Sequence, residues 1–239
     1  MKQHITTLIL DFDDTLCDFT AVRTKIADFL DAFCKRKYGV EGFGKLIDEL
    51  DTEMTIIART KKDPQLDNRG LWAKIAGKRL GLDLTNTQCQ EIRKIYWKIA
   101  LEKTKLLPYT KEVLRKLAKK YKLFILSDAD GETAAEKISR IKKLGIYKFF
   151  KGAVFGDAIG TTKPDIKFYT YLIKKYKIKP KESVMVGDKP QYDLAPAKEL
   201  GITTVWLKHG RWATMQRARK FPYVDYRVTQ LSQLLRILE

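Results

Sequence analysis

The sequence predicts an α/β fold in which a parallel sheet carries an inserted, all-helical lobe. Short apolar runs alternate with segments of helical periodicity over most of the chain, the pattern of strands joined by crossover helices. Between residues 18 and 105 the strand signal is absent and only helical periodicity remains. Several apolar runs end in an acid or a hydroxyl residue, and the ligand crevice of such a sheet lies beyond the carboxyl ends of its strands.

Five short apolar runs have the length expected of strands buried on both faces. These predicted strands are Ile5–Leu10, Leu123–Leu126, Ala153–Phe155, Ser183–Val186 and Thr203–Leu207. Apolar residues at spacings of three and four separate the later runs and predict helices. The predicted helices are Thr110–Lys120, Glu132–Lys143, Asp165–Lys175 and Tyr192–Leu200, with a short amphipathic helix at the end of the chain containing Leu231, Leu234, Leu235 and Leu238.

The helical lobe is predicted from two apolar stripes. The first consists of Phe19, Val22, Ile26, Phe29 and Phe33. The second consists of Ile92, Ile95, Tyr96 and Ile99, and the capping-box pattern Thr87-x-x-Gln90 opens it. We therefore expect residues 1–17 and 106–239 to form the core, and residues 18–105 to form a lobe over the crevice.

The composition indicates a soluble, cytoplasmic protein. With 44% hydrophobic residues among 239, the chain is not disordered as a whole, and no apolar run approaches the ~20 residues of a membrane span. The first residues lack the cleavage site of a signal peptide. The three cysteines show no CxxC spacing, so neither a disulfide framework nor a zinc site is predicted. Two isolated histidines argue against a histidine-dependent triad.

The net charge of +18 has two interpretations. It could serve binding of nucleic acid or another polyanion. It could instead be a lysine-rich solvated surface of the kind found in heat-adapted proteins, which the scarcity of Asn favours. The basic residues form scattered amphipathic groups within residues 115–122, 137–151, 174–181 and 208–220, and none resembles a nucleic-acid module. We favour the surface interpretation and do not expect a nucleic-acid partner.

The strongest chemical signal is the segment Leu10-Asp11-Phe12-Asp13-Asp14-Thr15-Leu16. Three acids in four residues at the end of an apolar strand repel one another unless a cation or a proton separates them. Mg²⁺ prefers carboxylate, carbonyl and water oxygens, so a divalent metal would relieve the repulsion. If the chain turns here, Asp11 and Asp13 can both face the crevice, where one attacks and the other handles a proton. Acid-rich turns are common at strand ends, so the segment alone does not decide the matter.

Three further positions strengthen this interpretation. Ser127 ends a predicted strand and can donate a hydrogen bond to an anionic oxygen. Lys163 begins a predicted helix, where its ammonium can pair with a phosphate and with the charge of a nucleophile. Asp188 follows a buried strand in a GDxxxxD pattern that ends at Asp193, and these acids could complete a metal site and its supporting contacts.

Together these segments resemble the haloacid dehalogenase (HAD) superfamily of hydrolases, in the subgroup with a helical (C1) cap inserted after the first motif. The resemblance extends from residue 5 to about residue 210 and rests on Asp11–Thr15, Ser127, Lys163, Asp188 and Asp193. It implies a Rossmann-like, doubly wound core with residues 18–105 as the cap. It also implies a phosphatase that uses Mg²⁺ and acts on a small phosphorylated metabolite.

The resemblance implies roles for the acids. Asp11 would be the nucleophile that forms an aspartyl-phosphate. Asp13 would protonate the leaving oxygen and then activate water. The Asp11 carboxylate, the Asp13 backbone carbonyl and Asp188 would hold Mg²⁺.

The remaining motif residues would support this chemistry. Ser127 and Lys163 would bind the phosphoryl oxygens. Asp193 would orient Lys163 or a metal-bound water, and Thr15 would support its loop through its hydroxyl. The chain departs from the usual pattern at Asp128, where Asn is frequent, as well as at Lys189 and Pro196. Specificity would belong to the cap, where the candidate crevice residues are Phe19, Arg23, Arg59, Lys61 and Trp72.

Three alternatives stay open. A 2-haloacid dehalogenase attacks carbon without a metal and lacks an acid two residues after the nucleophile, whereas this chain has Asp13 there, and Asp188 is also retained. A phosphomutase shares these acids and a similar cap. A polyanion-binding protein with a vestigial site would account for the +18 charge, although the intact acids argue against it.

Overall fold

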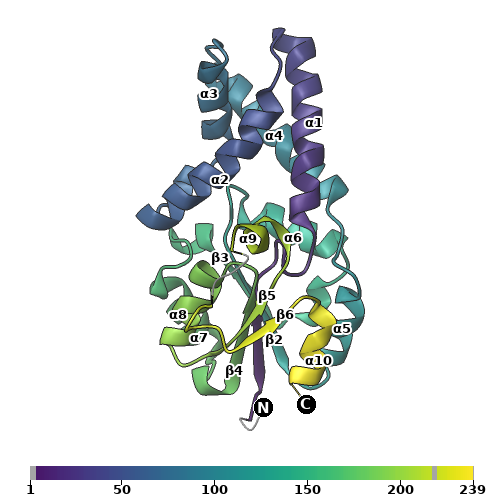
Figure 1. Ribbon diagram of the computed structural model, residues 1–239, viewed down its shortest axis with the longest axis vertical. Helices are drawn as coiled ribbons and strands as arrows, with labels where there is room; N and C mark the ends of the chain where they lie inside the picture. Colours follow the sequence, from purple (N-terminus) through teal and green to yellow (C-terminus); the bar gives the residue numbers. More distant parts are fainter. Residues whose placement is uncertain (1–3, 217–219, 239) are drawn as a thin grey trace.

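The computed structural model describes residues 4–216 and 220–238 and confirms the predicted α/β fold (Figure 1). All strand pairs of its six-stranded sheet are parallel, in the order β3-β2-β1-β4-β5-β6. The strands are β1 (Thr7–Leu10), β2 (Lys122–Ser127), β3 (Gly152–Phe155), β4 (Ser183–Gly187), β5 (Thr203–Leu207) and β6 (Tyr226–Val228). The order reverses on either side of β1, and such a switch point opens a crevice at the carboxyl ends of the strands.

Helices cover both faces of the sheet. One apolar cluster packs α5 (Thr110–Leu117), α6 (Ala134–Lys143) and α10 (Leu234–Ile237) against alternate residues of β1 and β2. A second cluster packs α7 (Ile166–Tyr176) and α8 (Ala195–Glu199) against the residues between them. Leu8 and Leu10 belong to the first cluster and Ile9 to the second, so β1 is buried on both faces, as its continuous apolar run predicted.

A lobe of four helices lies above the carboxyl edge of the sheet (Figure 1). These are α1 (Phe19–Tyr38), α2 (Phe43–Lys61), α3 (Arg69–Arg79) and α4 (Asn86–Lys103), and they follow β1 in the chain. They enclose an apolar cluster of their own, centred on buried residues such as Leu30, Trp72 and Tyr96. No helix among the described residues is long and apolar enough to cross a membrane.

Two details of the predicted lobe are wrong. Phe29 is 50% exposed, and Leu30 and Cys34 are buried in its stead, because the buried stripe of α1 continues at spacings of four after Ile26. The capping box of α4 is formed by Thr85 and Gln88, two residues earlier than predicted.

The end of the chain also differs from the prediction. The expected helix Tyr192–Leu200 is divided into a π-helical turn, η5 (Pro190–Leu194), and the short α8. Strand β6 and the short helix α9 (Gly210–Met215) were not predicted, since a three-residue strand and a six-residue helix carry too few residues to show a period. Short 3₁₀ turns complete the described chain: η1 (Pro64–Asp67), η2 (Tyr147–Phe149), η3 (Gly156–Ile159), η4 (Pro180–Glu182) and η6 (Leu231–Gln233).

Candidate active site

The polar residues predicted to carry the chemistry lie at one edge of the sheet. Asp11 follows β1 directly, Ser127 is the last residue of β2, and Asp188 follows β4. Both β2 and β4 pair with β1, so the three residues come from adjacent strands. All three are buried, and the lobe lies above them (Figure 1).

Lys163 connects two of the acids. Its ammonium Nζ lies 2.8 Å from Asp11 Oδ1 and 2.6 Å from Asp193 Oδ1. Burial alone would lower the pKa of Lys163, but Asp11 and Asp193 outweigh it and hold that pKa well above its usual value. The backbone N–H of Lys189 donates to the second oxygen of Asp193 at 2.8 Å, within the π-helical turn η5. This turn therefore fixes the acid that orients Lys163.

The site contains an acid cluster that fits a divalent cation. Carboxylate oxygens of Asp11, Asp188 and Asp193 lie within 4.8 Å of one another. Asp188 is fully buried, and neither of its oxygens has a hydrogen-bond partner among the described residues, although the Lys189 ammonium lies 3.7 Å from Oδ1. Burial raises the pKa of Asp188 well above its ordinary value. A buried carboxylate that accepts no hydrogen bond is costly unless a cation is bound close to it or a proton is taken up, so the donor set fits a hard metal.

The carboxylate of Asp13 contacts two buried cations. Arg140 binds it with two parallel hydrogen bonds, of 2.7 Å to Oδ1 and 2.9 Å to Oδ2. Lys137 Nζ lies 3.1 Å from Oδ2, and Glu132 holds Arg140 from the other side at 2.6 Å. Burial would raise the pKa of Asp13, but Arg140 and Lys137 outweigh it and hold that pKa far below its usual range. Asp13 is therefore ionised in this arrangement.

Lys137 and Arg140 are site residues that the sequence analysis missed. It placed them in a solvated basic group, and that prediction is wrong because both side chains are almost completely buried. Their spacing in α6 was a usable signal: Lys137 and Ile141 lie four apart, so they share the helix face that packs inward. The Arg140 guanidinium also lies 4.8 Å from the ring of Phe19 and 5.9 Å from that of Trp97, both in the lobe.

The two other acidic-loop residues have local roles. Asp14 has a positive φ of 58° and accepts hydrogen bonds from the backbone N–H and the hydroxyl of Thr20 at 2.8 and 2.7 Å. It thus ties the loop to the start of α1. The hydroxyl of Thr15 is buried without a hydrogen-bond partner among the described residues, so the bond expected to support the loop is not seen in this arrangement.

A further chain of contacts links the lobe to the loop that carries Lys163. Arg59 of α2 reaches across to Asp128 at 3.1 Å and Asp130 at 2.8 Å, in the loop after β2. Asp128 Oδ1 accepts a hydrogen bond from the Thr162 hydroxyl at 2.6 Å and another from the backbone N–H of Lys163 at 2.8 Å. One carboxylate therefore contacts both a lobe arginine and the backbone of the candidate catalytic lysine.

The space between lobe and core is nearly closed beside the acidic loop, whereas a cleft of about 720 Å³ lies farther along, between lobe residues such as Asn68 and Arg93 and core residues such as Gly131 and Asp157. A cavity of about 30 Å³ remains beside the acidic loop, lined in part by Asp13, Asp14, Phe19, Arg23, Arg69 and Lys189. Such a volume holds about one water molecule. Of the lobe residues expected at the crevice, Phe19 and Arg23 line this cavity, whereas Lys61 is exposed to solvent. Trp72 was predicted wrongly, because it is buried inside the lobe, where its indole N–H donates to the Leu66 carbonyl.

Comparison with known proteins identifies the family. The sequence matches the haloacid dehalogenase-like hydrolases over residues 5–201. The glyceraldehyde 3-phosphate phosphatase of Pyrococcus furiosus is 35% identical over 133 residues, which are 55% of this chain and 54% of that relative. The chain thus matches about half the length of that enzyme. The phosphoserine phosphatase of Thermus thermophilus is 25% identical over 229 residues, 85% of this chain and 88% of that relative.

Among solved structures, that of the HAD-hydrolase YfnB from Bacillus subtilis, bound to magnesium, is similar over almost the whole chain. It covers 99% of this chain and 100% of its own, with a TM-score of 0.79 and 17% identity. At that identity the likeness shows the fold.

Proposed function

Because the chain belongs to the haloacid dehalogenase-like hydrolases, we propose that it is a Mg²⁺-dependent phosphatase that hydrolyses a small phosphate monoester through an aspartyl-phosphate. The proximity of Asp11 to Lys163 on one side and to Asp188, whose oxygens accept no hydrogen bond among the described residues, on the other carries the proposal. A cation and a metal site on either side of one carboxylate suit an anionic substrate. The names of the phosphatases from P. furiosus and T. thermophilus support the same reaction class.

In the proposed reaction an oxygen of Asp11 attacks phosphorus, and the bond from phosphorus to the leaving oxygen breaks. Asp13 gives that oxygen its proton. In the second step Asp13 takes a proton from a water molecule, whose oxygen attacks phosphorus, releases inorganic phosphate and regenerates Asp11. Lys163 and Ser127 bind the phosphoryl oxygens and stabilise the charge that develops on them.

The contacts of Asp13 bear on the order of these events. With Arg140 and Lys137 beside it, Asp13 is in the ionised form that serves the second, water-activating step. To act as an acid first, it must take up a proton, and an incoming phosphoryl dianion would favour that uptake because like charges disfavour ionisation. We infer that substrate binding and protonation of Asp13 occur together.

The residues that would hold the metal are Asp11, Asp188 and the backbone carbonyl of Asp13. Asp193 lies close enough to take part directly or through a water molecule. When bound, Mg²⁺ would screen the charge between nucleophile and phosphate and orient both. The protein contributes the fixed positions of these oxygens and their burial.

We assign residues 18–105 to a cap domain and the rest of the chain to the core. The cap has its own apolar cluster and closes over the site through Phe19, Arg23 and Arg59. A lobe that leaves so little space favours a small metabolite over a protein or a polynucleotide as substrate. We expect such an enzyme to act in the cytoplasm.

The retained acids argue against one rival within the family, and the fate of the phosphoryl group distinguishes the other. A halide leaves without a proton, so a 2-haloacid dehalogenase would have no use for Asp13 or for the metal-type cluster around Asp188. A phosphomutase would use the same residues but return the phosphoryl group to a second hydroxyl instead of to water.

The test is a panel of phosphorylated metabolites, including glyceraldehyde 3-phosphate and phosphoserine, assayed for phosphate release with Mg²⁺ and with excess EDTA. We expect Mg²⁺-dependent release from at least one compound and from p-nitrophenyl phosphate. Full activity in EDTA would refute the metal assignment. Halide release from 2-chloropropionate without phosphatase activity would refute the reaction class, and isomerised sugar phosphate without free phosphate would identify a mutase.

A further inference from the structure

We propose that the end of the core opposite the active site is a nucleic-acid-binding surface that holds phosphate groups through exposed lysine and arginine side chains. We call it the basic face and define it by residues 111–122, 142–151 and 174–181. These 30 residues contain fifteen Lys and Arg and a single acid, and so carry +14 of the chain's net charge of +18. All fifteen basic side chains are exposed. This proposal is independent of the phosphatase function.

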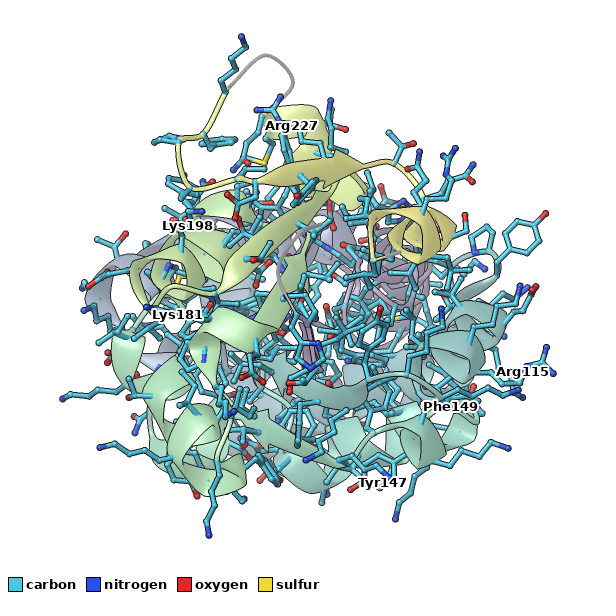
Figure 2. The ribbon with its side chains drawn as sticks, turned by 90° about the horizontal axis from the view of Figure 1, so that it is seen from below. Arg115, Tyr147, Phe149, Lys181, Lys198 and Arg227 are labelled. Carbon is cyan, nitrogen blue, oxygen red and sulfur yellow. The ribbon has the colours of Figure 1, made fainter. Side chains whose placement is uncertain are left out.

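The topology brings the three segments together. Lys122 begins β2, the backbone N–H of Lys151 donates to Leu123 just before β3, and Lys181 lies two residues before β4. Since the strands are parallel, their starts share one edge, and Asp11 and Asp188 lie at the other. Figure 2 looks onto the basic face and shows Arg115, Tyr147 and Phe149 on one side of the sheet and Lys181 on the other.

Helix dipoles account for only part of this charge. Cations in the last turn of a helix are favourable, which explains residues such as Arg115, Lys142 and Lys174. Eight lysines instead lie outside the α-helices, in connecting segments, in the 3₁₀ turns η2 and η4 or at strand starts: Lys119, Lys120, Lys122, Lys148, Lys151, Lys177, Lys179 and Lys181. Charge of one sign on one surface destabilises the folded state through repulsion, so these lysines need another explanation.

Heat adaptation does not explain the excess of lysines on the basic face. Heat-adapted surfaces use networks of both signs. Here Lys116 pairs with Glu112 at 2.8 Å and Lys179 with Glu182 at 2.9 Å, but Glu112 is the only acid within the three segments. The sequence alone could not show this, because the three groups are far apart along the chain and meet only through the parallel sheet.

The chemistry of the basic face favours nucleic acid over a lipid surface. Membrane-binding surfaces combine cations with exposed apolar anchors. Among the described residues, the strongly exposed large apolar side chains are Phe29, Ile56, Leu71, Tyr109, Tyr171 and Met215, and none lies in the three segments. Tyr147 and Phe149 are half-buried beneath Lys142 and Lys148, at 5.4 and 5.6 Å from the ring centroids. The face therefore offers charge without anchors, which suits a phosphate backbone.

The size of the face sets the expected strength of binding. It spans a helix, the sheet and a second helix, a distance of about 20 Å at roughly 10 Å per layer. A nucleic-acid strand places about six phosphates along that distance at 3.4 Å each. Neutralising about six phosphates makes affinity fall about 10³-fold between 50 and 200 mM salt.

The test is fluorescence anisotropy of a labelled 20-base-pair duplex of random sequence, titrated with the full chain in 50, 100 and 200 mM KCl. The face variant replaces four lysines by Gln: Lys120, Lys122, Lys148 and Lys151. The matched control makes the same change in net charge on the lobe, at the exposed Lys25, Lys78, Lys94 and Lys98. We expect the face variant to lose at least tenfold in affinity at 100 mM KCl. The slope of its log affinity against log salt concentration should be smaller than that of the wild type by about four. The control should stay within twofold of the wild type.

Three results would overturn the proposal. The first is no binding by the wild-type chain in 50 mM KCl, and the second is an equal loss in the face and control variants, which would mean that net charge alone acts. The third is tighter binding to phosphatidylserine vesicles than to the duplex at equal salt, which would identify a membrane partner. Thermal unfolding verifies that the variants are folded, and Lys151→Glu repeats the test with one substitution. Phosphate release by the face variant should equal that of the wild type, because the basic face lies away from Asp11.

Discussion

Replacing Asp128 with Asn tests how the lobe is coupled to Lys163. The Asn side chain keeps an acceptor oxygen for the Thr162 hydroxyl and for the Lys163 amide, so only the negative charge beside Arg59 is lost. A hydrogen bond to a charged group contributes about 1.5–3 kcal/mol. Because the Arg59 guanidinium keeps two other carboxylate partners, we expect the lower end of this range. A loss of about 1.5 kcal/mol corresponds to roughly a tenfold decrease in kcat/KM.

Two companion variants separate the charge from the hydrogen bonds. Asp128→Ala also removes both bonds that anchor the Lys163 loop, so kcat should fall by a further factor of about ten to a hundred. Asp130→Asn neutralises another partner of Arg59 without touching that loop, so its kcat should stay within a few-fold of the wild type. The measurements are kcat and KM for p-nitrophenyl phosphate at saturating Mg²⁺, with a double-mutant cycle that adds Arg59→Met. Equal kcat values for Asp128→Ala and Asp130→Asn, or a coupling energy near zero between Arg59 and Asp128, would refute the reasoning.

The remaining predictions concern the acids of the site. Asp11→Asn should lower turnover by orders of magnitude, because the amide cannot form the acyl-phosphate. The thermal unfolding midpoint should stay within a few degrees of the wild type, because the side chain is nearly isosteric. A variant that keeps a third of wild-type turnover would show that another residue is the nucleophile. Asp13→Asn should slow single-turnover cleavage of an alkyl phosphate far more than that of p-nitrophenyl phosphate, whose leaving group needs little protonation, and equal losses would make Asp13 a structural residue. Asp188→Asn should weaken Mg²⁺ affinity at least tenfold in a titration of activity against Mg²⁺, since it removes a buried anionic ligand. An unchanged Mg²⁺ concentration at half-maximal activity would show that Asp188 does not bind the metal. Arg140→Met should raise the pKa of Asp13, because burial then opposes Lys137 alone, and should move the acidic limb of the kcat profile to higher pH, since Asp13 must be ionised to activate water in the second step. An unmoved limb would show that Asp13 does not set it.

Much of the fold and of the candidate site could be predicted because both depend on position along strands. Asp11, Ser127 and Asp188 end or follow apolar runs, and a parallel sheet necessarily brings the ends of neighbouring runs together. Periodicity likewise identified the long helices, since α1 and α4 each repeat their apolar spacing over several turns. These predictions needed only local patterns and one topological rule.

The missed features depend on contacts between distant segments. Arg140 has the appearance of a surface residue in a basic helix, and only the folded chain places it between Asp13, Glu132 and the aromatic ring of Phe19. Burial of a charge is decided by its partners, which lie over a hundred positions away in the case of Asp13. The one-residue shift of the buried stripe in α1, which exposes Phe29, similarly follows from the helix that packs against it.

The nearly closed cavity beside Asp13 makes binding and catalysis compete. A volume of about 30 Å³ admits a water molecule but no phosphate ester, so a substrate can bind only to those molecules whose lobe has moved away. The apparent dissociation constant is then the intrinsic constant divided by the open fraction, and an open fraction of about 1% raises it about a hundredfold. Substitutions that loosen Arg59 or Phe19 should consequently bind a phosphate analogue faster and more tightly while turning substrate over more slowly. In the proposed reaction, the closed lobe would thus lower the affinity for substrate while keeping bulk water away from the acyl-phosphate.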